Sequence, residues 1–226
     1  MKKNNYWKKY QLEHQKKWSF NPSSKKIDYK YIGRVKTDFK EIDYLVSKLE
    51  KIKKTESGVE KNPKIKNKKV IAKINLYKNW GYNSENTKFY RAFSNDHQKV
   101  FQKYIDFSGL EMATSSIIKQ FPGQTVPWHQ DHHVDFLRRI KEKRMNIRKK
   151  KVLRYMMFLT DWDYGHFFCV GSSIVEKWKK GDIITWNPHI HHCGCNGGIT
   201  PKVTMNITGV VSKNSIHLKK AKFFSI

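Results

Sequence analysis

Two residues near the middle of the chain, His129 and Asp131, have the types and the spacing of metal ligands. They close the stretch 121–131, which reads FPGQTVPWHQD. Residues two apart on a β-strand point to the same face, so this imidazole and this carboxylate would be directed at a common atom. Such a pair supplies two of the three protein ligands of a 2-His-1-carboxylate site for iron(II). A surface turn or an ordinary hydrogen-bonded pair would use the same residues, so a third ligand is needed.

A dense group of candidate ligands lies downstream in the segment 186–195, which reads WNPHIHHCGC. One interpretation is a zinc or copper module with softer ligands, built from His189, His191, His192, Cys193 and Cys195. Adjacent and alternate positions on one strand do not easily converge on a tetrahedron, which disfavours that module. If the chain is extended here, His191 shares a face with the two cysteines and His192 lies on the opposite face.

The segment 202–209, KVTMNITG, has the pattern of a strand with one polar and one apolar face. The polar face would carry Lys202, Thr204, Asn206 and Thr208, and the apolar face Val203, Met205 and Ile207. A strand that packs one face on a core and turns a polar face inward is expected where a small barrel encloses a polar ligand.

Together these residues resemble the 2-oxoglutarate- and iron(II)-dependent oxygenases. The family pattern is His-x-Asp, Gly-Asp before an apolar strand, an aromatic residue ahead of a distal His, and then a basic residue followed by x-Ser/Thr. The matching residues are His129, Asp131, Gly181, Asp182, Trp186, His192, Lys202 and Thr204. The segments 121–131 and 158–168 resemble short members of the class found in marine tailed phages. The resemblance extends over about 117–211.

The resemblance implies a ligand set and a reaction. His129, Asp131 and His192 would bind Fe(II), with O2 and 2-oxoglutarate as co-substrates, and a substrate C–H bond would be hydroxylated while 2-oxoglutarate yields succinate and CO2. Lys202 and Thr204 would hold the distal carboxylate of 2-oxoglutarate. Lysine stands where arginine is commoner in the class, so one ammonium replaces a two-pronged guanidinium. Asp131 favours hydroxylation, since related halogenases replace this carboxylate.

The expected fold class is α+β and mainly β: a double-stranded β-helix, or jelly-roll and cupin-like barrel, with supporting N-terminal helices on one face. A basic, aromatic-dotted arm (1–30) would precede a single domain (31–226). That domain would comprise helical support (38–110), a jelly-roll core (111–226) and a basic insertion (132–151).

Periodicity predicts the elements that position the site. Helices are expected at 38–54, begun by a capping box between Asp38 and Glu41, and at 95–107, begun by Ser94, Asn95 or Asp96. Strands are expected at 70–76, 113–121, 129–131, 151–159, 166–170, 174–178, 182–186 and 203–211, with a further one near 216–224. The strand 151–159 is apolar on both faces, as in a central strand. Arg154 within it would line the cofactor pocket or pair with a carboxylate.

The insertion 132–151 carries four of the seven arginines of the chain, Arg138, Arg139, Arg144 and Arg148. A partly amphipathic helix here would leave them on a solvated face. Because the insertion leaves the barrel directly after two ligands, it could instead form a lid that contacts the substrate.

Charge, cysteine content and hydropathy restrict the classes of partner and the compartment that the sequence predicts. The formal net charge of +27 favours a nucleic-acid surface, but 39 of the 46 basic residues are lysines spread from end to end, as a coding bias would also produce. The cysteines, Cys169, Cys193 and Cys195, form no even framework, which predicts a reducing, cytoplasmic setting. No stretch is long and apolar enough to span a membrane, and the first residues do not form a secretory signal.

The sequence does not name the substrate. A protein or peptide side chain is favoured, followed by an amino-acid-like metabolite and then a nucleobase. The alternative function is a basic nucleic-acid-binding or nucleobase-oxidising protein on the same barrel.

Overall fold

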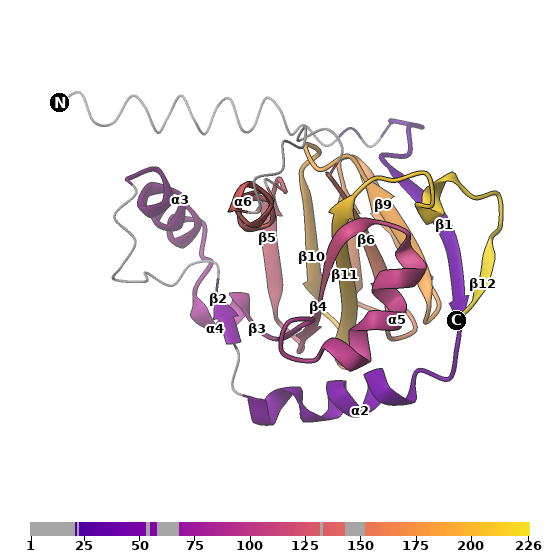
Figure 1. Ribbon diagram of the computed structural model, residues 1–226. Coiled ribbons are helices and arrows are strands. Elements are labelled where there is room, and N and C mark those ends of the chain that lie inside the picture. The colour runs from indigo at the N-terminus through magenta and orange to yellow at the C-terminus, as the bar shows by residue number, and fades with distance from the viewer. Residues whose placement is uncertain (1–20, 22, 53–54, 58–67, 132, 143–151) are drawn as a thin grey trace.

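A computed structural model describes residues 21, 23–52, 55–57, 68–131, 133–142 and 152–226, and they build two β-sheets flanked by helices (Figure 1). The larger sheet has the strand order β12 (Phe223–Ser225), β1 (Tyr29–Lys36), β9 (Asp182–Trp186), β6 (Val152–Phe158), β11 (Lys202–Val210), β4 (Glu111–Gln120), β3 (Lys88–Phe93) and β2 (Thr55–Ser57). The smaller sheet has the order β5 (Thr125–His129), β10 (His192–Asn196), β7 (His166–Val170) and β8 (Ser173–Val175).

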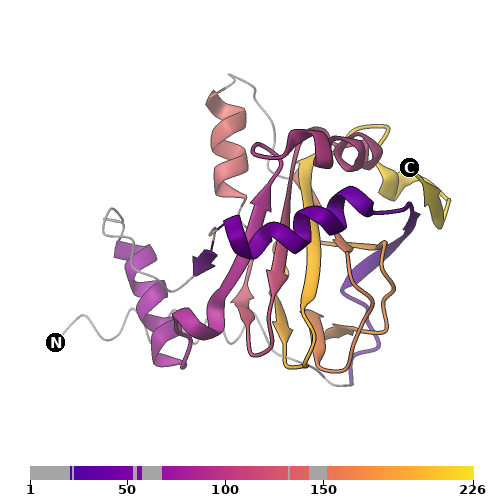
Figure 2. The ribbon, with the colours of Figure 1, turned by 90° about the horizontal axis from the view of Figure 1, so that it is seen from below.

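The helices lie outside the sheets. They are α2 (Lys40–Lys48), continued by the 3-10 turn η1 (Leu49–Ile52), and α3 (Lys68–Asn79), α4 (Ser84–Thr87), α5 (Gln98–Ser108), α6 (Val134–Glu142) and η3 (Ile216–Leu218). In Figure 2, α2 and α5 run across one face of the larger sheet. Of the helices in the described residues, none is long and apolar enough to cross a membrane.

The central strand β6 shows why the two layers form. Tyr155 and Met157 are buried on the face that packs with α2 and α5, in a core that also includes Phe101 and Ile42. The alternate residues Met156 and Phe158 pack toward the smaller sheet with an aromatic cluster: Phe168, Trp178 and Trp186. Burial on both faces requires apolar residues at successive positions, as in Tyr155 to Phe158. The expected jelly-roll fold with helices on one face is thereby confirmed.

Strand β11 also behaves as its alternation predicts. Val203, Met205 and Ile207 lie in the core under the helices. Lys202, Thr204 and Asn206 face the opposite side, where they line a cavity between the sheets. The observed bounds of β7 and β9 are those expected, whereas β5 ends at His129 and leaves Asp131 beyond the strand.

The N-terminal helix begins differently from the prediction. The capping box does not form, because Phe39 is the N-cap residue with φ 51° and no side-chain cap. Phe39 is buried and stacks on Tyr104, so packing of this ring fixes the entry of the chain into the helix. Asp38 accepts a hydrogen bond from the backbone N–H of Lys40, at 3.3 Å, and its Oδ2 lies 3.5 Å from Lys40 Nζ. The regular helix ends at Lys48, before the expected 54.

Two further expectations are wrong. Residues 70–76 are not a strand but part of α3, in which Ile74 and Tyr77 are both buried at helical spacing. A seven-residue apolar run is too short for periodicity to separate the two structures. Helix α5 starts at Gln98 without a cap from Ser94, since the Ser94 hydroxyl instead accepts a hydrogen bond from the N–H of Ser115.

Four strands were not predicted: β1, β2, β3 and β10. Strand β1 begins at Tyr29, inside the expected arm, most of which lies outside the described residues. In the expected tail strand 216–224, the structure has η3 and the short β12, which pairs in parallel with β1. These strands are held by pairing with distant segments, which local periodicity does not report.

The Gly-Asp pair belongs to the framework of the larger sheet. The buried carboxylate of Asp182 accepts hydrogen bonds from Arg34 Nε at 2.7 Å, Tyr31 Oη at 2.9 Å and the backbone N–H of Lys179 at 2.7 Å. Tyr31 and Arg34 lie on β1, so this carboxylate joins β1 to β9.

Replacing Asp182 by Ala is expected to lower the free energy of unfolding by about 3 kcal/mol, because a partly buried guanidinium then loses its counter-ion. Asp43 is the matched control, since its carboxylate is 50% exposed in its pair with Lys180. Asp43→Ala should cost less than about 1 kcal/mol. Urea denaturation of both variants measures the difference, and equal losses would contradict a special role for Asp182.

Candidate metal and cofactor site

Pairing of β5 with β10 brings two histidines together at one end of the smaller sheet. His129 and His192 stand directly opposite in the antiparallel register, and their ring centroids are 4.2 Å apart. Asp131 lies just past β5, where its backbone N–H donates to the carbonyl of Pro188 at 3.0 Å. The ligand atoms of these three residues all lie within 4.8 Å of one another. Convergence therefore comes from strand pairing and a turn, not from one continuous strand.

Backbone carbonyls orient both imidazoles. His129 Nδ1 lies 2.8 Å from the Pro127 carbonyl oxygen, and His192 Nδ1 lies 3.0 Å from that of Ile190. A proton on each Nδ1 makes these contacts hydrogen bonds and leaves the Nε2 lone pairs directed at Asp131. Trp186 Nε1 also lies 3.2 Å from His192 Nδ1. One ring nitrogen cannot donate and accept at once. Because the carbonyl contact is the shorter one, we assign the proton to His192 Nδ1, which then donates to the carbonyl of Ile190.

Asp131 is a buried carboxylate that stays charged. Burial by itself raises its pKa, but the attraction of Arg154, and then of His192 and His129, outweighs burial and holds the pKa of Asp131 below its usual value. Arg154 Nη1 donates to Asp131 Oδ1 at 2.6 Å, and Arg154 Nε donates to the hydroxyl of Thr208 at 3.1 Å. Arg154 therefore pairs with a carboxylate, as one of the two expectations for this residue had it, and it also lines the cavity between the sheets.

The other carboxylate oxygen has the environment of a metal ligand. Asp131 Oδ2 is buried, and the described residues give it no hydrogen-bond donor. It lies 3.5 Å from His192 Nε2. Burial lowers the pKa of His192, which favours the neutral imidazole that metals bind. Two imidazoles and a buried anionic oxygen that has no donor among the described residues fit a divalent cation.

The triad lies at one side of a cavity of about 270 Å³ between the sheets. Apolar walls are provided by Met156, Phe168 and Trp186. The polar lining includes Lys202, Thr204, Gln120 and Asn206. One cavity thus holds the three candidate ligands together with a buried cation.

Lys202 is 2% exposed, and its ammonium is held by backbone carbonyls. Its Nζ donates to the carbonyls of Phe167 at 2.7 Å and Cys195 at 3.0 Å. An ammonium has three donors, so one more is available to an acceptor in the cavity. Burial lowers the pKa of Lys202 to about 8. An anionic ligand beside it would restore the full charge.

Gly194 makes room beside that lysine, and it was not singled out from the sequence. A Cβ at this position would lie 3.3 Å from Lys202 Nζ and 3.2 Å from the Phe168 ring. The Gly194 carbonyl accepts from Gln120 Nε2 at 3.0 Å. The sequence signal that could have indicated this space is the His-x-Gly spacing of His192 and Gly194, because residues two apart on a strand share a face.

The histidine and cysteine cluster does not converge. His189 is exposed, whereas His191 is buried, with its Nδ1 3.5 Å from Gln130 Nε2. Within the described residues, one group of His, Cys, Asp or Glu side chains has the spacing to hold a metal, and it is His129, Asp131 and His192. The zinc or copper alternative is therefore wrong, because alternation along β10 separates Cys193 and Cys195 from His192.

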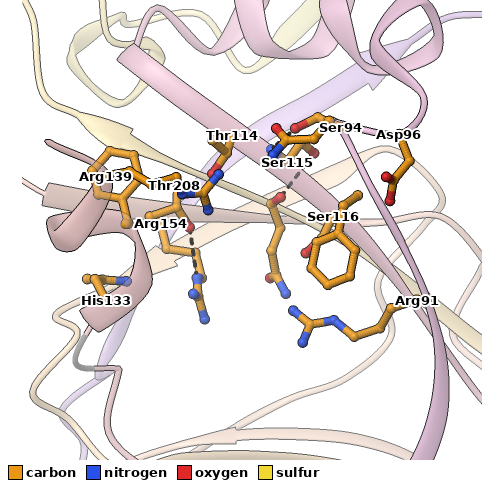
Figure 3. A pocket seen from close by; sticks show the side chains of 14 residues that line it. Arg91, Ser94, Asp96, Thr114, Ser115, Ser116, His133, Arg139, Arg154 and Thr208 are labelled. Atoms are coloured by element: carbon orange, nitrogen blue, oxygen red, sulfur yellow. Dashed lines mark hydrogen bonds between the residues drawn. The ribbon is translucent and has the colours of Figure 1, made fainter. Parts of the chain in front are cut away.

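A larger cavity of about 510 Å³ adjoins the first (Figure 3). Arg91, Arg154 and Asn206 line both cavities. Arg139 of the basic insertion lines the larger cavity, and Arg138 beside it is not among the lining residues. Arg144 and Arg148 lie outside the described residues. The insertion forms α6, which packs Phe136 and Ile140 against Val152 and Val210.

The sequence matches no protein-family model and no curated protein. Among solved structures, the non-heme alpha ketoglutarate dependent carbocyclase SnoK from nogalamycin biosynthesis is similar with a TM-score of 0.51 and 10% identity, over 87% of this chain and 81% of SnoK. The epimerase SnoN, of the same cofactor dependence and biosynthesis, gives 0.51 and 9%, over 80% and 76%. The viral collagen prolyl hydroxylase of Paramecium Bursaria Chlorella virus-1 gives 0.42 and 14%, over 81% and 97%. At these identities the similarity to SnoK and SnoN shows a shared fold.

The buried environment of Lys202 gives a direct test. In protein without added metal or cofactor, the Cε signal of Lys202 in carbon-13 NMR is expected to titrate near pH 8, whereas an unperturbed lysine titrates near 10.5. Lys202→Met identifies the signal by its loss. Titration of that signal together with the exposed lysines would contradict the burial of the ammonium.

Proposed function

We propose that the protein is a non-haem iron(II)- and 2-oxoglutarate-dependent oxygenase that hydroxylates a C–H bond of its substrate. The observation that carries this proposal is the convergence of His129, His192 and the donor-free oxygen of Asp131 in a cavity that also contains a buried lysine. A facial triad leaves coordination positions for a bidentate 2-oxo acid and for dioxygen. SnoK and SnoN, which share the fold, are a non-heme, alpha ketoglutarate dependent carbocyclase and epimerase, and this supports the co-substrate of the proposal.

Each residue of the site has a role in this proposal. His129, Asp131 and His192 would hold iron(II), and Arg154 would keep Asp131 ionised and fix its orientation through Oδ1. Lys202 and Thr204 would bind the distal carboxylate of 2-oxoglutarate from one face of β11. When bound, the metal and 2-oxoglutarate supply the oxidation, in which 2-oxoglutarate, O2 and R–H become succinate, CO2 and R–OH.

The surrounding residues would protect and position the reactants. Phe168 and Trp186 are buried beside His192, so they exclude water from one side of the triad. Gly194 leaves the space next to Lys202 that a carboxylate needs. Charge on Lys202 would be retained on binding, because a carboxylate at hydrogen-bond distance raises the lysine pKa.

The metal ligands can be separated from the neighbouring histidine. His129→Ala and His192→Ala are each expected to abolish stoichiometric binding of Co(II), which serves as a spectroscopic substitute for iron(II). Each change leaves the site with two of its three protein ligands, and this lowers its affinity for the metal. His191→Ala is the matched control in the same segment and should retain binding. Loss of the metal in His191→Ala with retention in His192→Ala would reverse the ligand assignment.

The cofactor assignment is tested by 2-oxoglutarate affinity. Anaerobic iron(II) and 2-oxoglutarate are expected to give a weak visible charge-transfer absorption, whose titration measures binding. Lys202→Met should weaken that binding at least about a hundredfold, since one partner of a buried charge pair is removed. Co(II) binding should be unchanged, and Lys179→Met, at a side chain 61% exposed, is the control.

The pH dependence of 2-oxoglutarate binding should reflect the protonation of Lys202. Affinity for 2-oxoglutarate is expected to fall as pH rises above about 8, the pKa of Lys202 in the free protein, because an uncharged amine binds a carboxylate weakly. A loss below threefold in Lys202→Met at unaltered metal content would contradict the assignment and transfer the carboxylate to Arg154.

A further inference from the structure

The larger cavity has a polar, cationic lining drawn from several elements (Figure 3). Arg91 comes from β3, Arg154 from β6 and Arg139 from α6. The carboxylate in the lining is that of Asp96, ahead of α5. Arg154 pairs with Asp131, and the guanidinium groups of Arg91 and Arg139 complete the cationic part of the lining.

Hydroxyl and amide groups occupy most of the remaining wall. The uncharged polar side chains are Ser94, Asn95, Thr114, Ser115, Ser116, Asn206 and Thr208, the aromatic ones are Phe93 and Phe136, and His133 completes the lining. A lining of guanidinium, hydroxyl and amide groups matches a ligand rich in oxygen and disfavours an apolar one. The cavity volume of about 510 Å³ lies within the range of small-molecule sites.

The position of this cavity relates it to the triad. Arg91, Arg154 and Asn206 are shared with the cavity that contains His129 and His192. In Figure 3, the guanidinium groups of Arg91 and Arg154 point into a common space. A molecule bound in the larger cavity would therefore lie next to the triad, while 2-oxoglutarate occupies the side of Lys202.

We propose that the larger cavity is the substrate site and that it selects a small, hydroxyl-bearing molecule with a carboxylate or phosphate group. That the bound molecule is the substrate rests on the proposed function, whereas the binding of such an anion does not. Arg91 and Arg139 would contact the anionic group, since guanidinium forms paired hydrogen bonds with both kinds of oxyanion. The hydroxyl and amide groups would bind the rest of the molecule.

Three probes of similar size separate charge from shape: sorbitol, gluconate and sorbitol 6-phosphate. Calorimetric titration of the full-length, metal-free protein is expected to give at least roughly tenfold tighter binding of one of the two anions than of neutral sorbitol, because charge-assisted hydrogen bonds are stronger than neutral ones. The preferred anion identifies the group that the site takes. Equal affinity for all three probes would overturn the proposal.

Arg139 and Arg138 form a matched pair of variants. Both are exposed residues of α6, so neutralising either changes the net charge equally and should leave the fold intact. Arg139→Gln is expected to weaken the anionic probe roughly tenfold, and Arg138→Gln to leave it within about twofold. Equal losses in both variants would overturn the proposal in favour of long-range surface charge, as would binding of an acidic peptide or oligonucleotide that excludes the probe.

The two cavities and the two proposals can be distinguished by competition. Saturating 2-oxoglutarate should leave the affinity of the anionic probe unchanged, and Lys202→Met should not affect it. Displacement of the probe by 2-oxoglutarate would place the probe in the cofactor cavity and overturn the inference. Failure of 2-oxoglutarate to bind at all, with probe binding still dependent on Arg139, would refute the proposed function and keep the anion site.

Discussion

The site depends on keeping one buried carboxylate charged. Asp131 loses most of its hydration, and an isolated charge in that environment would be neutralised by protonation. Arg154 prevents this through a contact to Oδ1, while His192 Nε2 lies 3.5 Å from the other oxygen, Oδ2. The carboxylate thereby keeps an anionic oxygen for which the described part of the chain has no donor, and a divalent cation can satisfy it. Arg154 in turn is fixed by Thr208 on the neighbouring strand.

The barrel provides the positions that this electrostatic arrangement needs. His129 and His192 face each other because β5 and β10 pair in one register, and a shift of one residue would turn His192 to the outer face. Lys202 and Thr204 reach the same cavity from β11 in the opposite sheet. The two sheets therefore supply different ends of the site, and the buried rings of Phe168 and Trp186 lie beside His192.

Charge is distributed differently in the two adjoining cavities. The smaller one combines apolar walls and the shared Arg91 and Arg154 with the buried ammonium of Lys202, whose reduced pKa makes it responsive to an incoming anion. The larger one carries arginines, which stay charged at any physiological pH, among hydroxyl and amide groups. Arg154 stands between them and contacts the carboxylate of the triad, so a ligand in either cavity lies close to the same three residues.

The sequence by itself determined the jelly-roll fold and the polar face of β11, because strict alternation encodes which side chains face inward. It also marked His129, Asp131 and His192, through residue types and spacings. Only the tertiary structure decided how they meet, since the register of β5 with β10 joins segments 63 residues apart in the chain. The same holds for Gly194, for the Arg154 ion pair and for α3, where contacts between distant segments outweighed the local pattern.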